Sequence, residues 1–166
     1  MCKARPANEQ AGDRMRQETK AERPDKTVIT YGTFDLLHVG HVRLLRRIAE
    51  LGRRVIVGCS TDEFNALKGK KTIMPYEDRV EMLLACRHVD AVFAEECWEQ
   101  KPADIAAHGA DLFVMGSDWA GKFDDLTACC DVLYLPRTPD VSSTQIKQEI
   151  QAAPGLRKAA LKLVKG

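Results

Sequence analysis

The chain has 166 residues, a hydrophobic content of 45% and a formal net charge of +1. This length favours one domain with one core, and the nearly balanced charge argues against a protein that coats nucleic acid. No apolar run is long enough to span a membrane, and the first residues lack the apolar segment of a signal peptide. The six cysteines include no C-x-x-C pair, which indicates reduced thiols in a cytoplasmic protein rather than a metal or redox site.

The first 26 residues carry charges of both signs and almost no large apolar side chain, so we expect a flexible tail at 1–26. From residue 27 to 151, apolar strands alternate with amphipathic helices. This alternation predicts an α/β domain with a Rossmann-like, five-stranded parallel sheet and helices on both faces. We expect residues 152–166, a basic amphipathic segment, to pack on the domain or to fray rather than to lie on a membrane. The expected strands are residues 27–31, 54–59, 91–94, 111–115 and 131–135; the expected helices are residues 39–51, a short helix beginning at Ser60 with capping-box spacing to Glu63, and residues 75–86, 101–108 and 144–151.

The connection between the first strand and the first helix, with the sequence TYGTFDLLHVGH, is the most informative stretch. His38 and His41 are three residues apart, so they share one face at the start of the helix. The free N–H groups of a helix N-terminus attract phosphate, and Gly40 leaves room for close approach of a ligand. The pattern therefore predicts a nucleotide phosphate site, although each histidine alone would also fit a surface or satisfied core position.

A basic loop, Lys68-Gly69-Lys70-Lys71, follows the second strand. Two ammonium groups on a mobile loop can close over a polyphosphate, whereas the plainer interpretation is a solvated basic loop. Because ligands of such sheets bind at the carboxyl ends of the strands, the position of Lys68 and Lys70 favours a functional role.

Two more candidate loops follow the fourth and fifth strands. Asp118 could accept a hydrogen bond from an exocyclic amine such as that of cytosine, or simply cap a turn. Arg137 could hold phosphate oxygens, and the spacing of Ser142 and Gln145 predicts a helix cap at a second anion site. Trp98 is expected near the same rim, with burial in the core as the alternative.

These motifs resemble the GTFDxLHxGH form of the HxGH nucleotidyltransferase superfamily. The pieces STDEFN, KGKK, YEDR, WEQK, FVMGSDW, GKFD and YLPRT also match, from residue 27 to about residue 150. The segments RTPDVSST, WEQK and GSDW narrow the resemblance to the glycerol-3-phosphate cytidylyltransferase branch. The chain departs from the branch motif RTxGISTT in having Asp140 in place of glycine and Ser143 in place of threonine.

The resemblance implies transfer of CMP from CTP to glycerol 3-phosphate, with Mg²⁺ on the triphosphate and no direct protein ligand, in a homodimer. It also implies that the product serves in building surface polymers such as teichoic acids or capsules. The implied roles are backbone N–H donors at Thr33 and Phe34, phosphate donors at His38 and His41, cations on the reacting phosphates at Lys68 and Lys70, triphosphate ligands at Arg137, Thr138 and Ser142, a cytidine pocket at Arg87 and Asp118, and an acceptor side at Arg79 and Trp98 with the two lysines.

Several alternatives stay open. Phosphocholine or phosphoethanolamine would need an aromatic-rich pocket, and only 6% of the residues are aromatic. Adenylyl transfer to a phosphopantetheine-like or flavin acceptor would keep the same chemistry. A nucleotide-binding module without catalysis is a different class of protein, and a class I aminoacyl-tRNA synthetase fragment lacks support because no KMSKS-like segment occurs.

Overall fold

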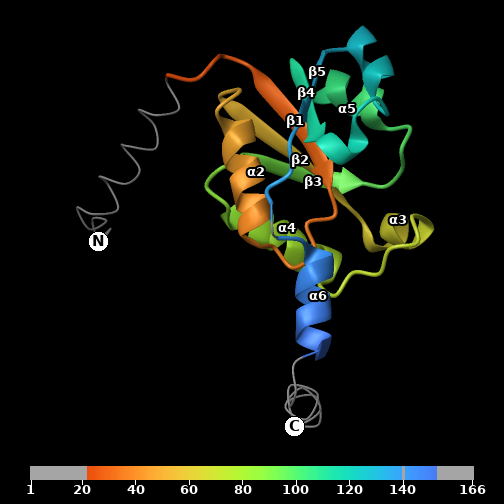
Figure 1. Cartoon of the computed structure of the whole chain (residues 1–166). Coiled ribbons are helices and arrows are strands. Elements are labelled where there is room, and N and C mark those ends of the chain that lie inside the picture. Colours follow the sequence, from red (N-terminus) through yellow and green to blue (C-terminus); the bar gives the residue numbers. More distant parts are fainter. Residues whose placement is uncertain (1–21, 140, 153–166) are drawn as a thin grey trace, which may run out of the picture.

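The computed structural model describes residues 22–139 and 141–152, which form a single parallel sheet with helices on both faces (Figure 1). The sheet order is β3-β2-β1-β4-β5, and every neighbouring pair of strands is parallel. The predicted Rossmann-like architecture is confirmed. The strands are β1 Thr27–Gly32, β2 Arg54–Ser60, β3 Ala91–Glu95, β4 Leu112–Gly116 and β5 Asp131–Leu135.

The helices lie in two layers. The α-helices are α2 Val39–Ala49, α3 Asp62–Leu67, α4 Tyr76–Ala85, α5 Lys101–His108 and α6 Ser143–Ala152, and two short 3₁₀ helices are η1 Ser117–Trp119 and η2 Asp124–Ala128. Helices α2 and α4 cover one face of the sheet, and α5 and η2 cover the other (Figure 1). Because successive strand residues point to opposite faces, Val28 packs in the first core and Ile29 in the second.

The order of the strands reverses beside β1, since β2 lies on one side of it and β4 on the other. This is the place where open α/β sheets bind ligands, at the carboxyl ends of the strands. The chain segments that leave β1, β2, β4 and β5 therefore start from one edge of the molecule.

One local prediction is wrong. The short helix α3 begins at Asp62, and its cap is Thr61, whose hydroxyl accepts the N–H of Phe64, rather than Ser60. Ser60 is the last residue of β2, where it pairs with Glu95 of β3 and is fully buried. Strand pairing therefore outweighs the local capping-box pattern at this position.

The chain ends are described only in part. Residues 1–21, residue 140 and residues 153–166 lie outside the described residues, so most of the expected tail, the substitution at Asp140 and most of the basic segment do as well. Within residues 22–26, Asp25 pairs with Arg53, and Lys26 pairs with Asp131 at the start of β5. In the part of the chain that the structure describes, no helix is long and apolar enough to cross a membrane.

Gly58, in the centre of β2, is so closely packed that a larger side chain at this position should destabilise the protein. A Cβ atom there would overlap the ring of Tyr31, and the hydroxyl of Tyr31 is fixed by a 2.9 Å hydrogen bond to Asp104. We expect Gly58→Ala to lower the free energy of unfolding by about 1–3 kcal/mol, as overpacked cores do. Chemical denaturation measures this change.

Gly116→Ala is the matched control. A Cβ atom at Gly116 meets nothing within 4 Å, and its φ of −66° suits alanine. The prediction fails if the two variants are equally stable.

Candidate active site

Two hollows meet at the carboxyl edge of the sheet. The larger has a volume of about 440 Å³, and the smaller has a volume of about 260 Å³. They share His41, Ser143 and Thr144 in their walls. Of the residues predicted from the sequence, the larger contains Thr33, Phe34, His41, Lys68, Lys70 and Trp98, and the smaller contains His38, His41, Arg137, Thr138 and Ser142.

The loop after β1 has an unusual backbone. Phe34 and Leu36 have φ values of 52° and 50°, in the left-handed region that side chains disfavour. Such strain costs roughly 1–3 kcal/mol per residue and persists only where surrounding contacts impose it. The loop that leads into the paired histidines is therefore held in place by its surroundings.

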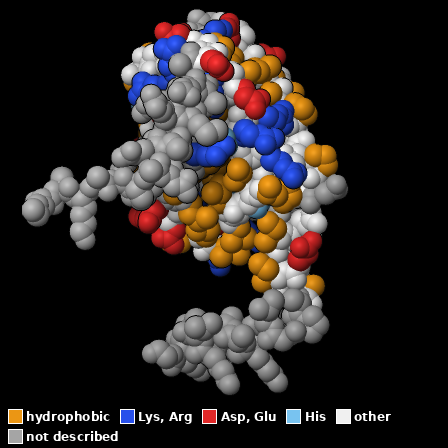
Figure 2. Space-filling view, turned by 90° about the vertical axis from the view of Figure 1, so that its left-hand side faces the viewer, with side chains coloured by type: hydrophobic (Ala, Val, Ile, Leu, Met, Phe, Trp, Pro, Cys, Tyr) orange, Lys and Arg blue, Asp and Glu red, His pale blue; other side chains and the backbone are white. Residues whose placement is uncertain are grey.

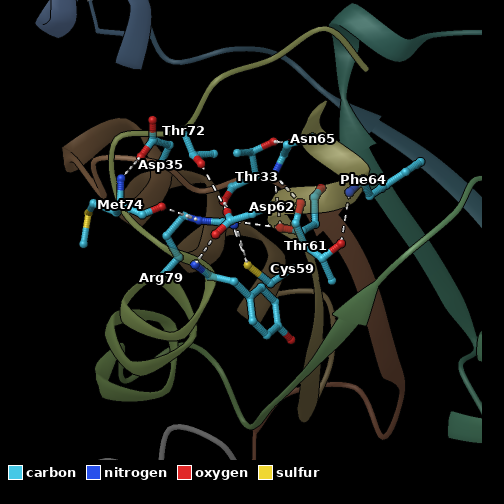
Figure 3. A network of polar contacts seen from close by, with 12 residues as sticks. Thr33, Asp35, Cys59, Thr61, Asp62, Phe64, Asn65, Thr72, Met74 and Arg79 are labelled. Atoms are coloured by element: carbon cyan, nitrogen blue, oxygen red, sulfur yellow. Dashed lines mark hydrogen bonds and ion pairs between the residues drawn. The ribbon is translucent and has the colours of Figure 1, made fainter. Parts of the chain in front are cut away.

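Asp35 makes several of the contacts that fix this loop. Its buried carboxylate accepts the N–H groups of Ile73 and Met74 and pairs with the ammonium of Lys147 at 2.6 Å (Figure 3 shows the Met74 contact). Burial by itself would raise the pKa of Asp35, but the hydrogen bonds from Lys147, Met74 and Ile73 hold it below its usual value. Three segments, the loop after β1, the segment after the lysine loop and helix α6, are joined at this one carboxylate.

The two histidines cap helix α2 reciprocally. The Nδ1 atom of His38 accepts the N–H of Gly40 at 3.1 Å, and the Nδ1 atom of His41 accepts the N–H of His38 at 3.4 Å. Their rings stack with centroids 3.9 Å apart. A neutral imidazole whose Nδ1 accepts carries its proton on Nε2, so both rings are Nε2–H donors.

Both histidines are neutral at pH 7. Burial lowers the pKa of His41 from 6.5 to about 4, with a further contribution from His38, and burial also lowers the pKa of His38. Gly40 allows the tight arrangement, because a Cβ atom there would lie 2.8 Å from Cε1 of His38 and 2.8 Å from Cγ1 of Val141. The pair suits hydrogen-bond donation better than proton abstraction.

The two loop lysines differ in their surroundings. The side chain of Lys68 is only 9% exposed, and its ammonium donates to Ser60 Oγ at 2.8 Å and lies 3.6 Å from the Glu95 carboxylate. Burial lowers the pKa of Lys68, and Glu95 opposes that shift. Lys70 is exposed, with its ammonium 5.9 Å from the ring centroid of Trp119.

Trp98 lies at the pocket wall and is 38% exposed, so burial in the core is wrong for this residue. Its ring packs against Phe64 and Trp119, with centroid distances of 5.2 and 5.5 Å. The aromatic side of the larger hollow is therefore formed by Trp98 and Trp119, which follow β3 and β4, with Phe64 after β2 packed behind them.

Arg79 is not at the pocket surface, which corrects its expected role on the acceptor side. Its side chain is fully buried and donates to the carbonyl oxygens of Thr33, at 2.7 Å, and Ser60, at 2.8 Å (Figure 3). It also pairs with Asp62. The guanidinium thus binds the ends of β1 and β2 from within and supports the site without reaching a ligand.

Arg87 also lies elsewhere, so its expected place in the cytidine pocket is wrong for a single chain. It lines a separate hollow with Val42 of α2 and Met82 of α4. The physical reason is topological: Arg87 precedes β3, whereas the two hollows are walled largely by segments that follow strands.

Asp118 and Arg137 form an ion pair of 3.0 Å at the rim, and both side chains are at least half exposed. They follow β4 and β5, which are neighbours in the sheet. The hydroxyl of Ser142 accepts the N–H of Gln145 at 3.1 Å, which confirms the predicted cap, although the Gln145 side chain donates to Glu149 instead.

Lys101 was noted from the sequence as a cation near the rim but was given no role in the site. It is 2% exposed, at the start of α5, and its ammonium donates to Glu95 at 2.8 Å beneath the larger hollow. The available signal was its place in the WEQK segment directly after the third strand. Among the described residues, no group of three or more His, Cys, Asp or Glu side chains could hold a metal ion, and the five described cysteines are free thiols.

Comparison with known proteins gives consistent matches. A family model described as cytidylyltransferase-like matches residues 29–149. The glycerol-3-phosphate cytidylyltransferase of Bacillus subtilis is 56% identical over 125 residues, covering 75% of this chain and 97% of the relative. The enzyme of the same name from Staphylococcus aureus is 54% identical over 125 residues, covering 75% of this chain and 95% of the relative.

A solved structure shares the fold. The lipopolysaccharide core biosynthesis protein from Thermoplasma volcanium superimposes with a TM-score of 0.59 at 19% identity, covering 68% of this chain and 98% of that one. At this identity the likeness concerns the fold alone.

The low pKa of His41 makes stability depend on pH. Below about pH 6.5 the unfolded chain binds a proton at His41, whereas the folded protein binds it only near pH 4. We therefore expect the free energy of unfolding to fall as the pH drops from 6.5 to 4, with His41 contributing about 3 kcal/mol of the loss.

Denaturant titrations of the parent and of His41→Asn across this range isolate the effect, because all other groups are common to both. The variant should show the shallower dependence on pH. Identical slopes would mean that the histidine titrates normally in the folded protein.

Proposed function

The chain belongs to the cytidylyltransferase-like family, and from that premise we propose that it transfers CMP from CTP to glycerol 3-phosphate. One observation carries the assignment: more than half of the positions are identical to a glycerol-3-phosphate cytidylyltransferase over 97% of that relative's length. In the reaction, a phosphate oxygen of the acceptor forms a bond to the α-phosphorus of CTP. The bond from that phosphorus to the bridging oxygen breaks, which gives CDP-glycerol and pyrophosphate.

We propose that His38 and His41 act as donors in this transfer. The acceptor phosphate is already anionic near pH 7, so no general base is needed to activate it. Catalysis then depends on placing the reactants in line and on neutralising charge on the phosphate oxygens. Two neutral Nε2–H groups at the start of a helix suit this task, and the backbone N–H groups of Thr33 and Phe34 would add to it.

The cations divide between the two hollows. Lys68 and Lys70 in the larger hollow would span the reacting phosphates, while Arg137, Thr138 and Ser142 in the smaller one would hold the triphosphate and the leaving pyrophosphate. Asp118, paired with Arg137 at the rim, would help to define the cytidine side, and Trp98 would shape the acceptor side.

Mg²⁺ would enter with the nucleotide. The described residues offer no cluster of carboxylates or histidines for it, which fits an ion held mainly by triphosphate oxygens and water. Its part would be to neutralise phosphate charge, alongside the histidines and lysines.

A homodimer and a cytoplasmic location complete the proposal. Helices α2 and α4 expose Val39, Val42, Met82 and Leu84, each at least 36% accessible, and Val42 and Met82 line one hollow between these helices. Figure 2 views the molecule from the side on which α2 lies in Figure 1 and shows hydrophobic side chains gathered there. An apolar face of this kind suits a second copy of the chain. The free thiols fit a reducing compartment.

Loss of either histidine should slow the chemical step. We expect His38→Ala and His41→Ala each to lower kcat by about 10²-fold or more while the fold is retained, as removal of a transition-state donor does. Pyrophosphate release measures turnover, and circular dichroism checks folding. A folded double variant with near-normal turnover would exclude the histidines from the mechanism.

An acceptor panel tests the substrate assignment. The rings of Phe64, Trp98 and Trp119 already lie near the ammonium groups of Lys68 and Lys70, which would repel the quaternary amine of phosphocholine. We therefore expect pyrophosphate release with CTP and glycerol 3-phosphate, and much less with ATP or with phosphocholine or phosphoethanolamine. CTP binding without release for any acceptor would identify a binding module instead.

A further inference from the structure

Beneath the larger hollow, two lysines share one buried carboxylate. The Oε1 atom of Glu95 accepts the ammonium of Lys101 at 2.8 Å, and the Oε2 atom lies 3.6 Å from the ammonium of Lys68. The hydroxyl of Ser60 lies between, since it donates to Oε2 and accepts from Lys68 at 2.8 Å. All three charged side chains are 9% exposed or less.

The two lysines face different surroundings. Lys68 lines both the larger hollow and a second groove that contains Phe64 and Trp98, so its ammonium can reach a ligand. Lys101 lines neither, and its ammonium lies 4.6 to 5.4 Å from the ring centroids of Tyr31, Trp98 and Phe123. Lys101 is thus enclosed by rings and directed at Glu95 alone.

The charges explain why two lysines are needed. A carboxylate paired with Lys68 alone would neutralise it and draw its ammonium away from the hollow. With Lys101 on the opposite oxygen, the cluster carries one excess positive charge, and this charge belongs to the lysine that faces the ligand. In a site of low dielectric, such a preset charge is worth more than one exposed to water.

We propose that Lys101 is a positioning residue for the transfer reaction: it occupies one oxygen of Glu95 and so keeps the ammonium of Lys68 available to the reacting phosphates. The proposal rests on the proposed function, because it assigns the Lys68 charge to the phosphates of that reaction. Lys101 itself touches no substrate.

Lys101→Met tests the idea, since methionine keeps most of the length of the side chain and removes its charge. We expect kcat/KM to fall by about tenfold while the protein stays folded. The double variant E95Q/K101M restores the single excess charge of the cluster, so it should recover most of the lost activity. All variants are assayed well below their own unfolding temperatures.

A cycle with Lys68 separates positioning from a structural role. If Lys101 acts through Lys68, adding Lys101→Met to the double variant K68A/E95Q, in which no buried carboxylate is left unpaired, should change kcat/KM less than twofold. Lys122→Met is the matched control, because Lys122 also lies over an aromatic ring, 5.0 Å from the centroid of Trp119, yet has no contact with Glu95. Its turnover should equal that of the parent.

Three results would overturn the proposal: unchanged activity of Lys101→Met, no recovery in E95Q/K101M, or a full tenfold loss when Lys101→Met is added to K68A/E95Q. The last two results would point to a direct or purely structural role of Lys101. Failure of the parent protein itself to release pyrophosphate would instead refute the proposed function, so the two failures are distinguishable.

Discussion

The site depends on the buried carboxylate of Asp35. It binds two backbone N–H groups after the lysine loop and the ammonium of Lys147 on α6, and its own backbone carbonyl accepts the hydroxyl of Ser143 at 2.7 Å. These contacts join segments 38 and 112 residues away along the chain. They also fix a loop whose flanking residues, Phe34 and Leu36, have a left-handed backbone. The ammonium of Lys147 also donates to the carbonyl oxygen of Lys71 at 3.1 Å, so helix α6 contacts both the loop before the histidines and the lysine loop.

The site contains two kinds of positively charged side chain, and the degree of burial decides whether each one stabilises the fold or faces a ligand. Arg79 is enclosed and satisfied by carbonyl oxygens and a carboxylate, so its charge stabilises the ends of the strands. Lys68 is nearly enclosed but faces the hollow, so its charge remains available to an anion. The histidines, by contrast, contribute neutral N–H donors, because burial opposes their protonation. A polyanionic substrate thus meets fixed charges and fixed dipoles in a site that needs little reorganisation.

Local patterns predicted well what depends on neighbours in sequence. The alternation of apolar strands and helices gave the sheet, and the spacing of His38 and His41 gave a shared helix face. Ser142 caps its helix as its spacing suggested. The pattern at Ser60 and Glu63 misled, because pairing between β2 and β3 takes Ser60 into the sheet. Arg79 was assigned the wrong role, and Lys101 none, because their carbonyl, carboxylate and aromatic partners come largely from other strands and loops.

By itself, the sequence determined the fold class, the cytidylyltransferase resemblance and which loops leave the strands at one edge, since periodicity and short motifs express local preferences. Only the tertiary structure decided how charge is distributed at the site. Whether a lysine or arginine faces a ligand or an internal carboxylate depends on its burial and on partners distant in the chain. Those partners meet only when the parallel strands lie side by side, which is why Glu95 became the carboxylate shared by Lys68 and Lys101.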